Sequence, residues 1–338
     1  MASVVISLDA EVATESRPDA QQRAREGWLT LVDCFERYEI PATWAIVGRL
    51  FTDDDRLDGP PPEQWFTTPS ETRDATDAET EIEAMGRTNR TVDGRSLVEA
   101  VVESGVNHDI GSHSYSHPRF TEMTREFAHA DLTAARAAMA EWGIDPGSFV
   151  YPYNAAAHHD VLADVGFTCY RGVPEDGADT AVSKAPSART WQRTVLDLVP
   201  EAPKWWAGWA YDRGSEALAY TLGNEPPALI EPCVDDHGMI AIPQSMPPLY
   251  RMPVWLRRAL RSVGQYPLAR IAKMGIDAAI EKDGTFHLWF HPGDLYTESD
   301  FESFAMVLAY LADRRDDGVV EVETMADIAA RLGRCRSR

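Results

Sequence analysis

The amino-acid sequence predicts an α/β fold in which a parallel sheet curls into a barrel-like domain. Short apolar, β-branched segments alternate with amphipathic helical segments along most of the 338 residues, and acidic or histidine side chains follow several of the apolar segments. The chain is long enough to bury the core of one large domain. An open, doubly wound sheet remains the alternative, because the pattern alone does not separate it from a barrel.

The first elements predict a βαβ unit. Residues 4–8 and 41–47 are apolar runs typical of buried strands. Residues 19–36 lie between them and place large apolar side chains on one face of a helix. A helix that connects two buried strands is typical of parallel pairing.

The same alternation continues along the chain after residue 95. The further helices are predicted at residues 96–103, 122–142, 159–165, 299–314 and 325–332. The further strands are predicted at residues 107–112, 148–151, 167–170, 285–290 and 319–321. We therefore predict that residues 1–338 form a single domain.

Two stretches interrupt this alternation and predict insertions in the domain. Residues 52–95 are rich in Asp, Thr, Pro and Glu, which is typical of a polar insertion. Residues 173–284 form the second predicted insertion, which holds the cluster Trp205, Trp206 and Trp209 and a basic helix. The tryptophans could stack on sugar rings or pack the insertion onto the barrel.

The charge of the chain is strongly negative. It has 54 acidic and 32 basic residues, a formal net charge of −22, and only four of the basic residues are lysines. An acidic surface nearly without lysine favours a halophilic protein, since salt screens the repulsion between like charges. Nucleic acid is an unsuitable partner, because phosphate contacts require a basic face.

Cysteine usage and the apolar segments predict a cytoplasmic protein. The four cysteines are scattered without a CxxC pair, which favours free thiols in a reducing compartment. The segment MASVVISLDAE has neither a basic region nor a long apolar run, so it does not resemble a signal peptide. No apolar run reaches the length of a transmembrane helix.

Potential site residues follow three of the predicted strands. His113 and His117 come after residues 107–112, with a spacing that allows both rings to bind one metal ion. Asp9 and Glu11 end the first strand and point the same way, because residues two apart on a strand share a face. His291 follows residues 285–290. Active sites of α/β proteins form at such strand ends.

Five segments resemble, in order, the motifs of the polysaccharide deacetylase family (NodB-like, the carbohydrate esterase family 4 type). The segments are residues 6–11, 41–48, 109–117, 149–153 and 288–291. The resemblance implies a distorted (β/α) barrel with fewer than eight full units. It spans most of the chain apart from the two insertions.

The resemblance also implies roles for these residues. Asp9 is the expected general base and His291 the expected acid for the leaving amine. The expected ligands of a divalent metal ion, usually zinc, are Glu11, His113 and His117. The expected substrate-binding residues are Pro152, Tyr153, Asn154 and Arg171, with a backbone N–H near Tyr153 holding the oxyanion.

Three features depart from the family pattern. Ala10 separates two acids that are often adjacent, so the roles of Asp9 and Glu11 could be exchanged. Val150 stands where an arginine is expected, and Arg171 is a candidate to supply that charge from the next strand. No acid is evident that would orient the catalytic histidine, and Asp176 is the candidate we name.

Residues 251–282 carry seven basic and two acidic side chains, with apolar residues between them. This stretch could face an anionic glycan, a lipid-linked sugar phosphate or a membrane surface, or it could pair with acidic neighbours in the fold.

The sequence as a whole predicts a metal-dependent hydrolase that removes an acetyl group from an N-acetylated amino sugar or glycan precursor. A hydrolase of small amides on the same scaffold and a catalytically silent carbohydrate-binding relative are the alternatives.

Overall fold

The computed structural model describes residues 1–12, 18–52, 94–172, 226–245, 267–295 and 297–336. Within these residues the sheet is built around parallel strands that run in the order β8-β1-β2-β3-β4-β5-β7. The strands are β1 (Ser3–Ala10), β2 (Thr43–Ile46), β3 (Asp109–Ser112), β4 (Ser148–Val150), β5 (Cys169–Arg171), β7 (Ile240–Ile242) and β8 (Thr285–Phe290).

The sheet curls into a distorted (β/α) barrel. Its strand order never reverses, and the first strand of the chain lies beside β8. Ser245, which follows β7, donates its backbone N–H to the carbonyl oxygen of His287 in β8 over 3.0 Å. This bond links the two ends of the parallel order and confirms the barrel over a doubly wound sheet. Two short strands lie outside the order: β6 (Cys233–Val234) is antiparallel to β7, and β9 (Glu321–Glu323) pairs with β1.

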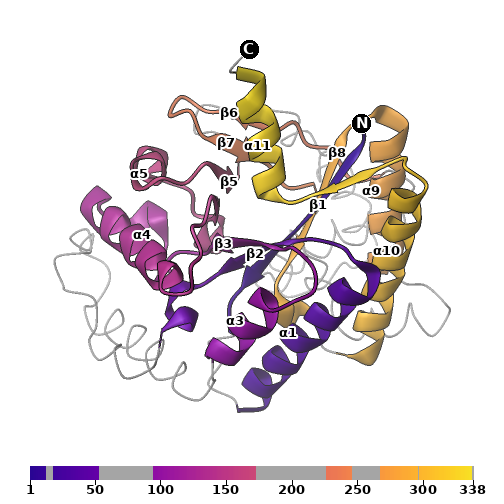
Figure 1. The fold of residues 1–338 in the computed structure, drawn as a ribbon, viewed down its shortest axis with the longest axis horizontal. Coiled ribbons are helices and arrows are strands. Elements are labelled where there is room, and N and C mark those ends of the chain that lie inside the picture. The colour runs from indigo at the N-terminus through magenta and orange to yellow at the C-terminus, as the bar shows by residue number, and fades with distance from the viewer. Residues whose placement is uncertain (13–17, 53–93, 173–225, 246–266, 296, 337–338) are drawn as a thin grey trace, which may run out of the picture.

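Helices surround the sheet, with α9 and α10 on one side and α4 and α5 on the other (Figure 1). The helices are α1 (Pro18–Tyr38), α3 (Gly94–Val102), α4 (Arg125–Ala140), α5 (His159–Val165), α9 (Pro267–Lys282), α10 (Glu298–Asp316) and α11 (Met325–Arg336). The short 3₁₀ helices are η1 (Gly48–Phe51), η5 (Phe120–Glu122), η6 (Pro152–Asn154) and η9 (Pro292–Asp294).

Apolar side chains fill both faces of the sheet. Between the outer face and the helices, Trp28, Phe35 and Trp44 are buried in one continuous cluster. A second buried cluster joins residues of five strands to Met325 and Ile328 of α11. The C-terminal helix therefore packs against the inner face of the sheet, leaving the opposite end, where the strands terminate, for polar side chains.

The predicted elements correspond to observed ones throughout the described residues, with one exception in the second predicted insertion. Within residues 173–284, β7 belongs to the sheet and α9 packs against α10 and β8. Both elements lie inside the range that the sequence assigns to the second insertion, because Pro and Gly residues precede the short apolar run of β7 and interrupt the pattern there. Most of residues 52–95, the tryptophan cluster and the first part of the basic stretch lie outside the described residues.

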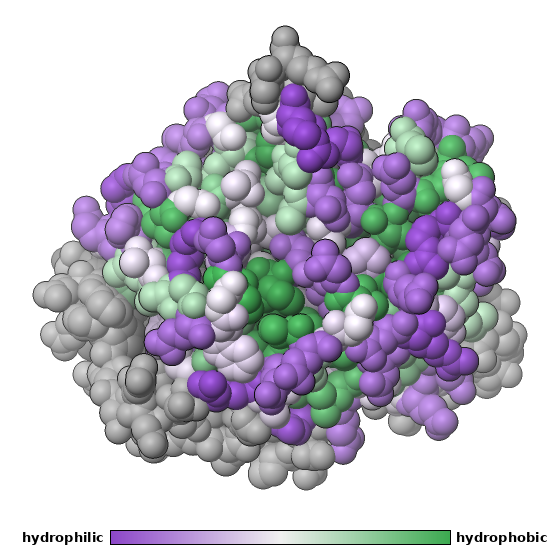
Figure 2. Space-filling view, viewed as in Figure 1, coloured by the Kyte–Doolittle hydropathy of each residue, from purple (hydrophilic) through white to green (hydrophobic). Residues whose placement is uncertain are grey.

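Hydrophilic residues cover most of the described surface on the face in Figure 2, and hydrophobic residues gather near its centre. No helix in the described ranges combines the length and the apolar character needed to cross a membrane.

Candidate active site

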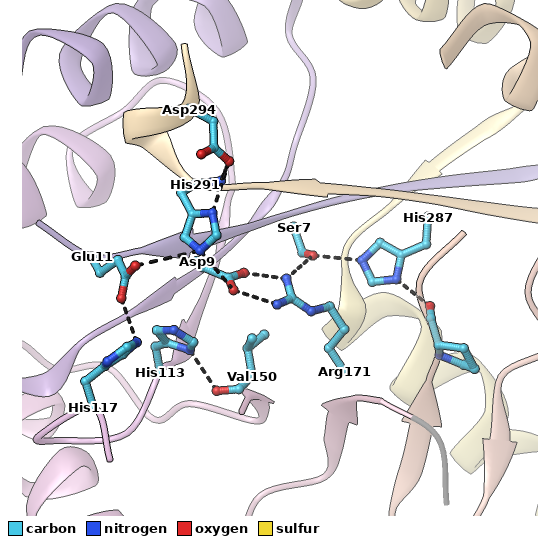
Figure 3. A network of polar contacts seen from close by, with 11 residues as sticks. Ser7, Asp9, Glu11, His113, His117, Val150, Arg171, His287, His291 and Asp294 are labelled. Atoms are coloured by element: carbon cyan, nitrogen blue, oxygen red, sulfur yellow. Dashed lines mark hydrogen bonds and ion pairs between the residues drawn. The ribbon is translucent and has the colours of Figure 1, made fainter. Parts of the chain in front are cut away.

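Acidic and imidazole side chains from three strand ends meet at one end of the barrel (Figure 3). Asp9 lies near the end of β1, and Glu11 follows that strand. His113 comes directly after β3, and His291 comes directly after β8. Because the strands are parallel, their carboxyl ends lie at the same edge, as the sequence predicts.

Glu11, His113 and His117 present ligand atoms that all lie within 4.8 Å of one another. The Nε2 atom of His117 lies 2.6 Å from Oε2 of Glu11. Burial raises the pKa of Glu11, but the charge and hydrogen bond of His117 outweigh burial and lower it to about 2. Glu11 is therefore ionised, as a metal ligand must be.

The tautomer of His113 also suits a metal ligand. Its Nδ1 atom lies 2.8 Å from the carbonyl oxygen of Val150, which can only accept, so Nδ1 carries the proton. Burial lowers the pKa of His113 to about 4, although Asp9 opposes the shift. The ring is neutral and its Nε2 lone pair is available. Two imidazoles and one carboxylate fit a divalent metal ion with positions left for water and substrate.

A buried carboxylate holds the loop that carries the two histidines. Asp131 of α4 accepts hydrogen bonds from the backbone N–H groups of Tyr115 (2.9 Å) and Ser116 (3.0 Å). It also accepts from the Ser116 hydroxyl. His117 adopts a left-handed backbone conformation with φ of 58°, and its N–H donates to the hydroxyl of Ser114. This uncommon conformation turns the second histidine back toward the first.

Asp9 is held by a buried arginine. Arg171 donates from Nη1 to Oδ1 of Asp9 (2.5 Å) and from Nη2 to Oδ2 (2.7 Å). Burial raises the pKa of Asp9, but the charges of Arg171, His291 and His113 hold it well below its usual range. Arg171 thus brings a positive charge to Asp9 from β5, the strand next to that of Val150.

The sequence prediction also places Arg171 among the substrate-binding residues, and the burial of its side chain argues against that role. The Arg171 side chain is 0% exposed and lies beneath Asp9, with its guanidinium 4.3 Å from the centre of the Trp289 ring. A bulky substrate has no access to a side chain buried at that depth. Arg171 supports the site from below.

His291 is oriented by Asp294, which the sequence prediction missed. One carboxylate oxygen of Asp294 accepts from the backbone N–H of His291 (2.8 Å) and lies 3.0 Å from its Nδ1. The Nε2 atom of His291 lies 3.7 Å from both Asp9 Oδ2 and Glu11 Oε1. Burial lowers the pKa of His291, but the hydrogen bond to Asp294 and the nearby carboxylates raise it to about 9.

The missed signal is the turn His291-Pro-Gly-Asp294, in which an acid three residues after a histidine caps the same short helix. The other candidate for this orienting acid, Asp176, lies outside the described residues.

The turn at η6 holds the remaining predicted substrate-binding residues. Tyr153 is 47% exposed and its ring centre lies 4.7 Å from that of His117. Asn154 is also exposed, whereas Pro152 is buried beneath them. Tyr153 and Asn154 both adopt left-handed backbone conformations. Of this group, Tyr153 and Asn154 are accessible beside the histidine pair.

A family model described as polysaccharide deacetylase matches residues 19–170. The match includes the histidine pair and the turn at η6. Asp9, Glu11 and His291 lie outside it and are brought to the same site by β1 and β8. No curated protein sequence matches the chain.

Two solved structures show the same fold at low sequence identity. One is a protein described as a polysaccharide deacetylase from Mycobacterium smegmatis, with a TM-score of 0.54 and 13% identity, covering 99% of this chain and 91% of that one. The other is a GH57-type branching enzyme from Pyrococcus horikoshii, with a TM-score of 0.51 and 9% identity, covering 98% of this chain and 69% of that one. Residues 19–170 thus match the polysaccharide deacetylase family model, and the chain as a whole has the fold of a solved structure described as a polysaccharide deacetylase.

Proposed function

We propose that the protein is a metal-dependent hydrolase that removes the acetyl group from an N-acetylated amino sugar or glycan precursor. The observation that carries the proposal is the grouping of three convergent metal-ligand atoms with Asp9 and His291. Deacetylase chemistry is the activity that the family match supports.

The cofactor in this proposal is a divalent ion. Among the common metals we propose zinc, because zinc accepts a mixed set of imidazole and carboxylate ligands. Held by Glu11, His113 and His117, such an ion would polarise the acetyl carbonyl and lower the pKa of the attacking water.

Asp9 is the general base in this proposal. Its Oδ2 atom lies 3.7 Å from His291 Nε2, on the side of the site that also faces Glu11. The paired hydrogen bonds from Arg171 keep the carboxylate ionised and fix its plane. An ionised carboxylate in a fixed orientation can accept the proton of the attacking water.

His291 is the acid that protonates the leaving amine. Asp294 accepts at Nδ1, so that Nε2 is the ring atom directed at the site. A proton at Nε2 can pass to the amine nitrogen as the carbon–nitrogen bond breaks. Asp294 thereby orients the acid His291, as a third group orients the base in a catalytic triad.

The exposed ring of Tyr153 is the surface that we assign to the sugar. Aromatic rings bind the apolar face of a sugar ring while the polar edge stays in water. Its backbone N–H is our candidate for the oxyanion donor.

The experiment is an acetate-release assay with a panel of N-acetylated sugars and glycans in high salt. It compares the protein as purified, after chelation, and after metal is restored. Asp9→Asn should abolish release, while Glu99→Gln, an exposed acid on α3, should leave it unchanged. Metal binding without acetate release would favour a small-amide hydrolase, and sugar binding without any metal would favour a silent carbohydrate-binding protein.

A further inference from the structure

Beside the Asp9–Arg171 pair, on the side away from Glu11, Ser7 and His287 form a second buried polar layer deeper in the barrel (Figure 3). Side chains two residues apart on a strand share a face, so Ser7 lies directly below Asp9 on β1. On β8 the same alternation places His287 below Trp289, with His291 above both. In the register of the two strands Ser7 pairs with Trp289 and His287 pairs with Val5, so the His287 ring lies one step deeper than Ser7 and reaches its hydroxyl from there.

The hydrogen bonds of this layer have a single consistent direction. His287 Nδ1 lies 2.7 Å from the carbonyl oxygen of Pro243, which can only accept, so Nδ1 carries the proton. Burial and the charge of Arg171 together lower the pKa of His287 to about 3, so the ring is neutral and Nε2 accepts. The Ser7 hydroxyl, 2.8 Å away, donates to Nε2. Its oxygen is then free to accept from Arg171 Nη1 at 3.2 Å.

The Arg171 nitrogen that contacts Ser7 also contacts the proposed base. Nη1 donates both to Ser7 Oγ and to Asp9 Oδ1. Ser7 and His287 are each 0% exposed, and Arg171 is 2% exposed. Solvent therefore cannot replace the acceptor if Ser7 loses its hydroxyl.

We propose that Ser7 and His287 are positioning residues, which fix the Arg171 guanidinium so that it holds Asp9 in its reactive orientation. This inference rests on the proposed function, because it assigns Asp9 the role of base. His287 is itself fixed at the junction of the barrel, where its backbone N–H donates to the Ser245 hydroxyl over 3.0 Å. The layer thus connects the closing contact of the barrel to the catalytic carboxylate.

The first test is Ser7→Ala, which removes the hydroxyl and adds no volume. We expect kcat for acetate release to fall about tenfold, the loss typical of one hydrogen bond to a charged group, with KM unchanged. Ser3→Ala is the matched control. Ser3 is a buried serine on the same strand whose hydroxyl donates to Glu323 at 2.6 Å, away from the site. The control should leave kcat unchanged, and equal kcat for Ser7→Ala and wild type would overturn the inference.

A double-mutant cycle separates positioning from a general structural effect. In the Arg171→Met background, Ser7→Ala should cause no further loss of kcat, because its effect passes through the guanidinium. Two independent, multiplying losses would show that Ser7 acts on the fold and not on Arg171.

A nitrogen NMR measurement tests the inference without any substrate. The wild-type His287 ring should show a proton on Nδ1 and none on Nε2, and the Arg171 guanidinium signals should broaden in Ser7→Ala but not in Ser3→Ala. A proton on Nε2, or Arg171 signals that Ser7→Ala leaves unchanged, would contradict the positioning role. If the wild type releases no acetate, the proposed function is wrong. The spectra still show in that case whether Ser7 and His287 hold the Arg171 guanidinium.

Discussion

Asp294 shows how one side chain determines the chemistry of another. It accepts from two donors of His291, the backbone N–H and the ring Nδ1. Because the ring can then offer only Nε2 to the site, its direction and its protonated atom are both fixed. The same logic applies to His113, whose Nδ1 donates to Val150, although there the outward nitrogen is a ligand and not an acid.

Asp294→Asn should lower kcat for acetate release about 100-fold, within the range of general acid catalysis. The amide is neutral, so it no longer stabilises a protonated imidazole. Steady-state kinetics give the result, with Asp300→Asn as the control. Asp300 caps α10 in a similar box with Thr297, so its loss should reduce stability and leave kcat unchanged. Wild-type kcat in Asp294→Asn would rule out the orienting role.

His108 predicts a pH dependence of stability that is separate from catalysis. Burial lowers its pKa to about 4, and its Nδ1 accepts from the backbone N–H of Ala42. In the unfolded chain the pKa returns to the ordinary value of about 6.5, so the unfolded state binds a proton first as the pH falls. The contribution of His108 is therefore complete above about pH 6.5 and is lost as the pH falls toward 4.

Urea unfolding of metal-free protein between pH 7 and pH 4 measures this effect. His108→Asn keeps an acceptor for Ala42 but does not titrate, so its free energy of unfolding should fall less steeply with pH than that of wild type. The difference in slope should approach about 1.4 kcal/mol per pH unit, the value for one proton. Parallel curves for the two proteins would show that His108 does not titrate on unfolding.

At the scale of elements, the loop from β3 to α4 is held in place by its neighbours. Asp131 accepts hydrogen bonds from two backbone N–H groups of this loop. Gly48 of η1 packs against Tyr115 of the loop so closely that an added Cβ would lie 3.1 Å from the Tyr115 Cα. The glycine of the segment at residues 41–48 therefore permits a close approach of backbone to backbone. This contact gives a physical reason for a glycine in a segment that has no chemically active side chain.

Asp131→Asn should weaken the binding of a divalent ion at least about tenfold, because residues that orient metal ligands typically contribute that much. The amide replaces one acceptor oxygen by a donor that faces the N–H groups of the loop. Titration calorimetry with zinc on metal-free protein measures the change. Glu126→Gln, an exposed acid on the same helix, should bind as wild type does. Equal affinity in Asp131→Asn would show that the loop is held by other contacts.

At the scale of the whole molecule, the negative charge predicts a response to salt. With a formal net charge of −22, like charges repel across the folded surface, and added salt screens that repulsion. We expect the thermal unfolding midpoint to rise by several degrees between low salt and molar potassium chloride. A midpoint that does not change with salt would contradict the halophilic prediction.

The barrel and the side chains at its strand ends could be predicted from the sequence, because their signals are local. Apolar β-branched runs mark the strands, and Asp9, His113 and His291 stand just where such runs end. Because the strands are parallel, their carboxyl ends lie at the same edge of the sheet whatever the connections between them. The strand β7 was missed, since its three residues follow a stretch rich in Pro and Gly that interrupts the strand–helix alternation.

The supporting contacts could not be predicted, because they join residues that are distant in the chain. The contact between Ser7 and His287 spans 280 positions, and that between Asp9 and Arg171 spans 162. A serine in an apolar strand has no pattern that distinguishes it from a packing residue. Only the closed barrel shows that these side chains meet in its interior.

The most direct test of the central claim is metal restoration of acetate release by chelator-treated protein. Release should stop on chelation, return as zinc is added, and saturate near one equivalent, with no recovery in Glu11→Gln. Full release after complete chelation would contradict a metal-dependent deacetylation. So would one equivalent of bound metal without acetate from any N-acetylated sugar or glycan.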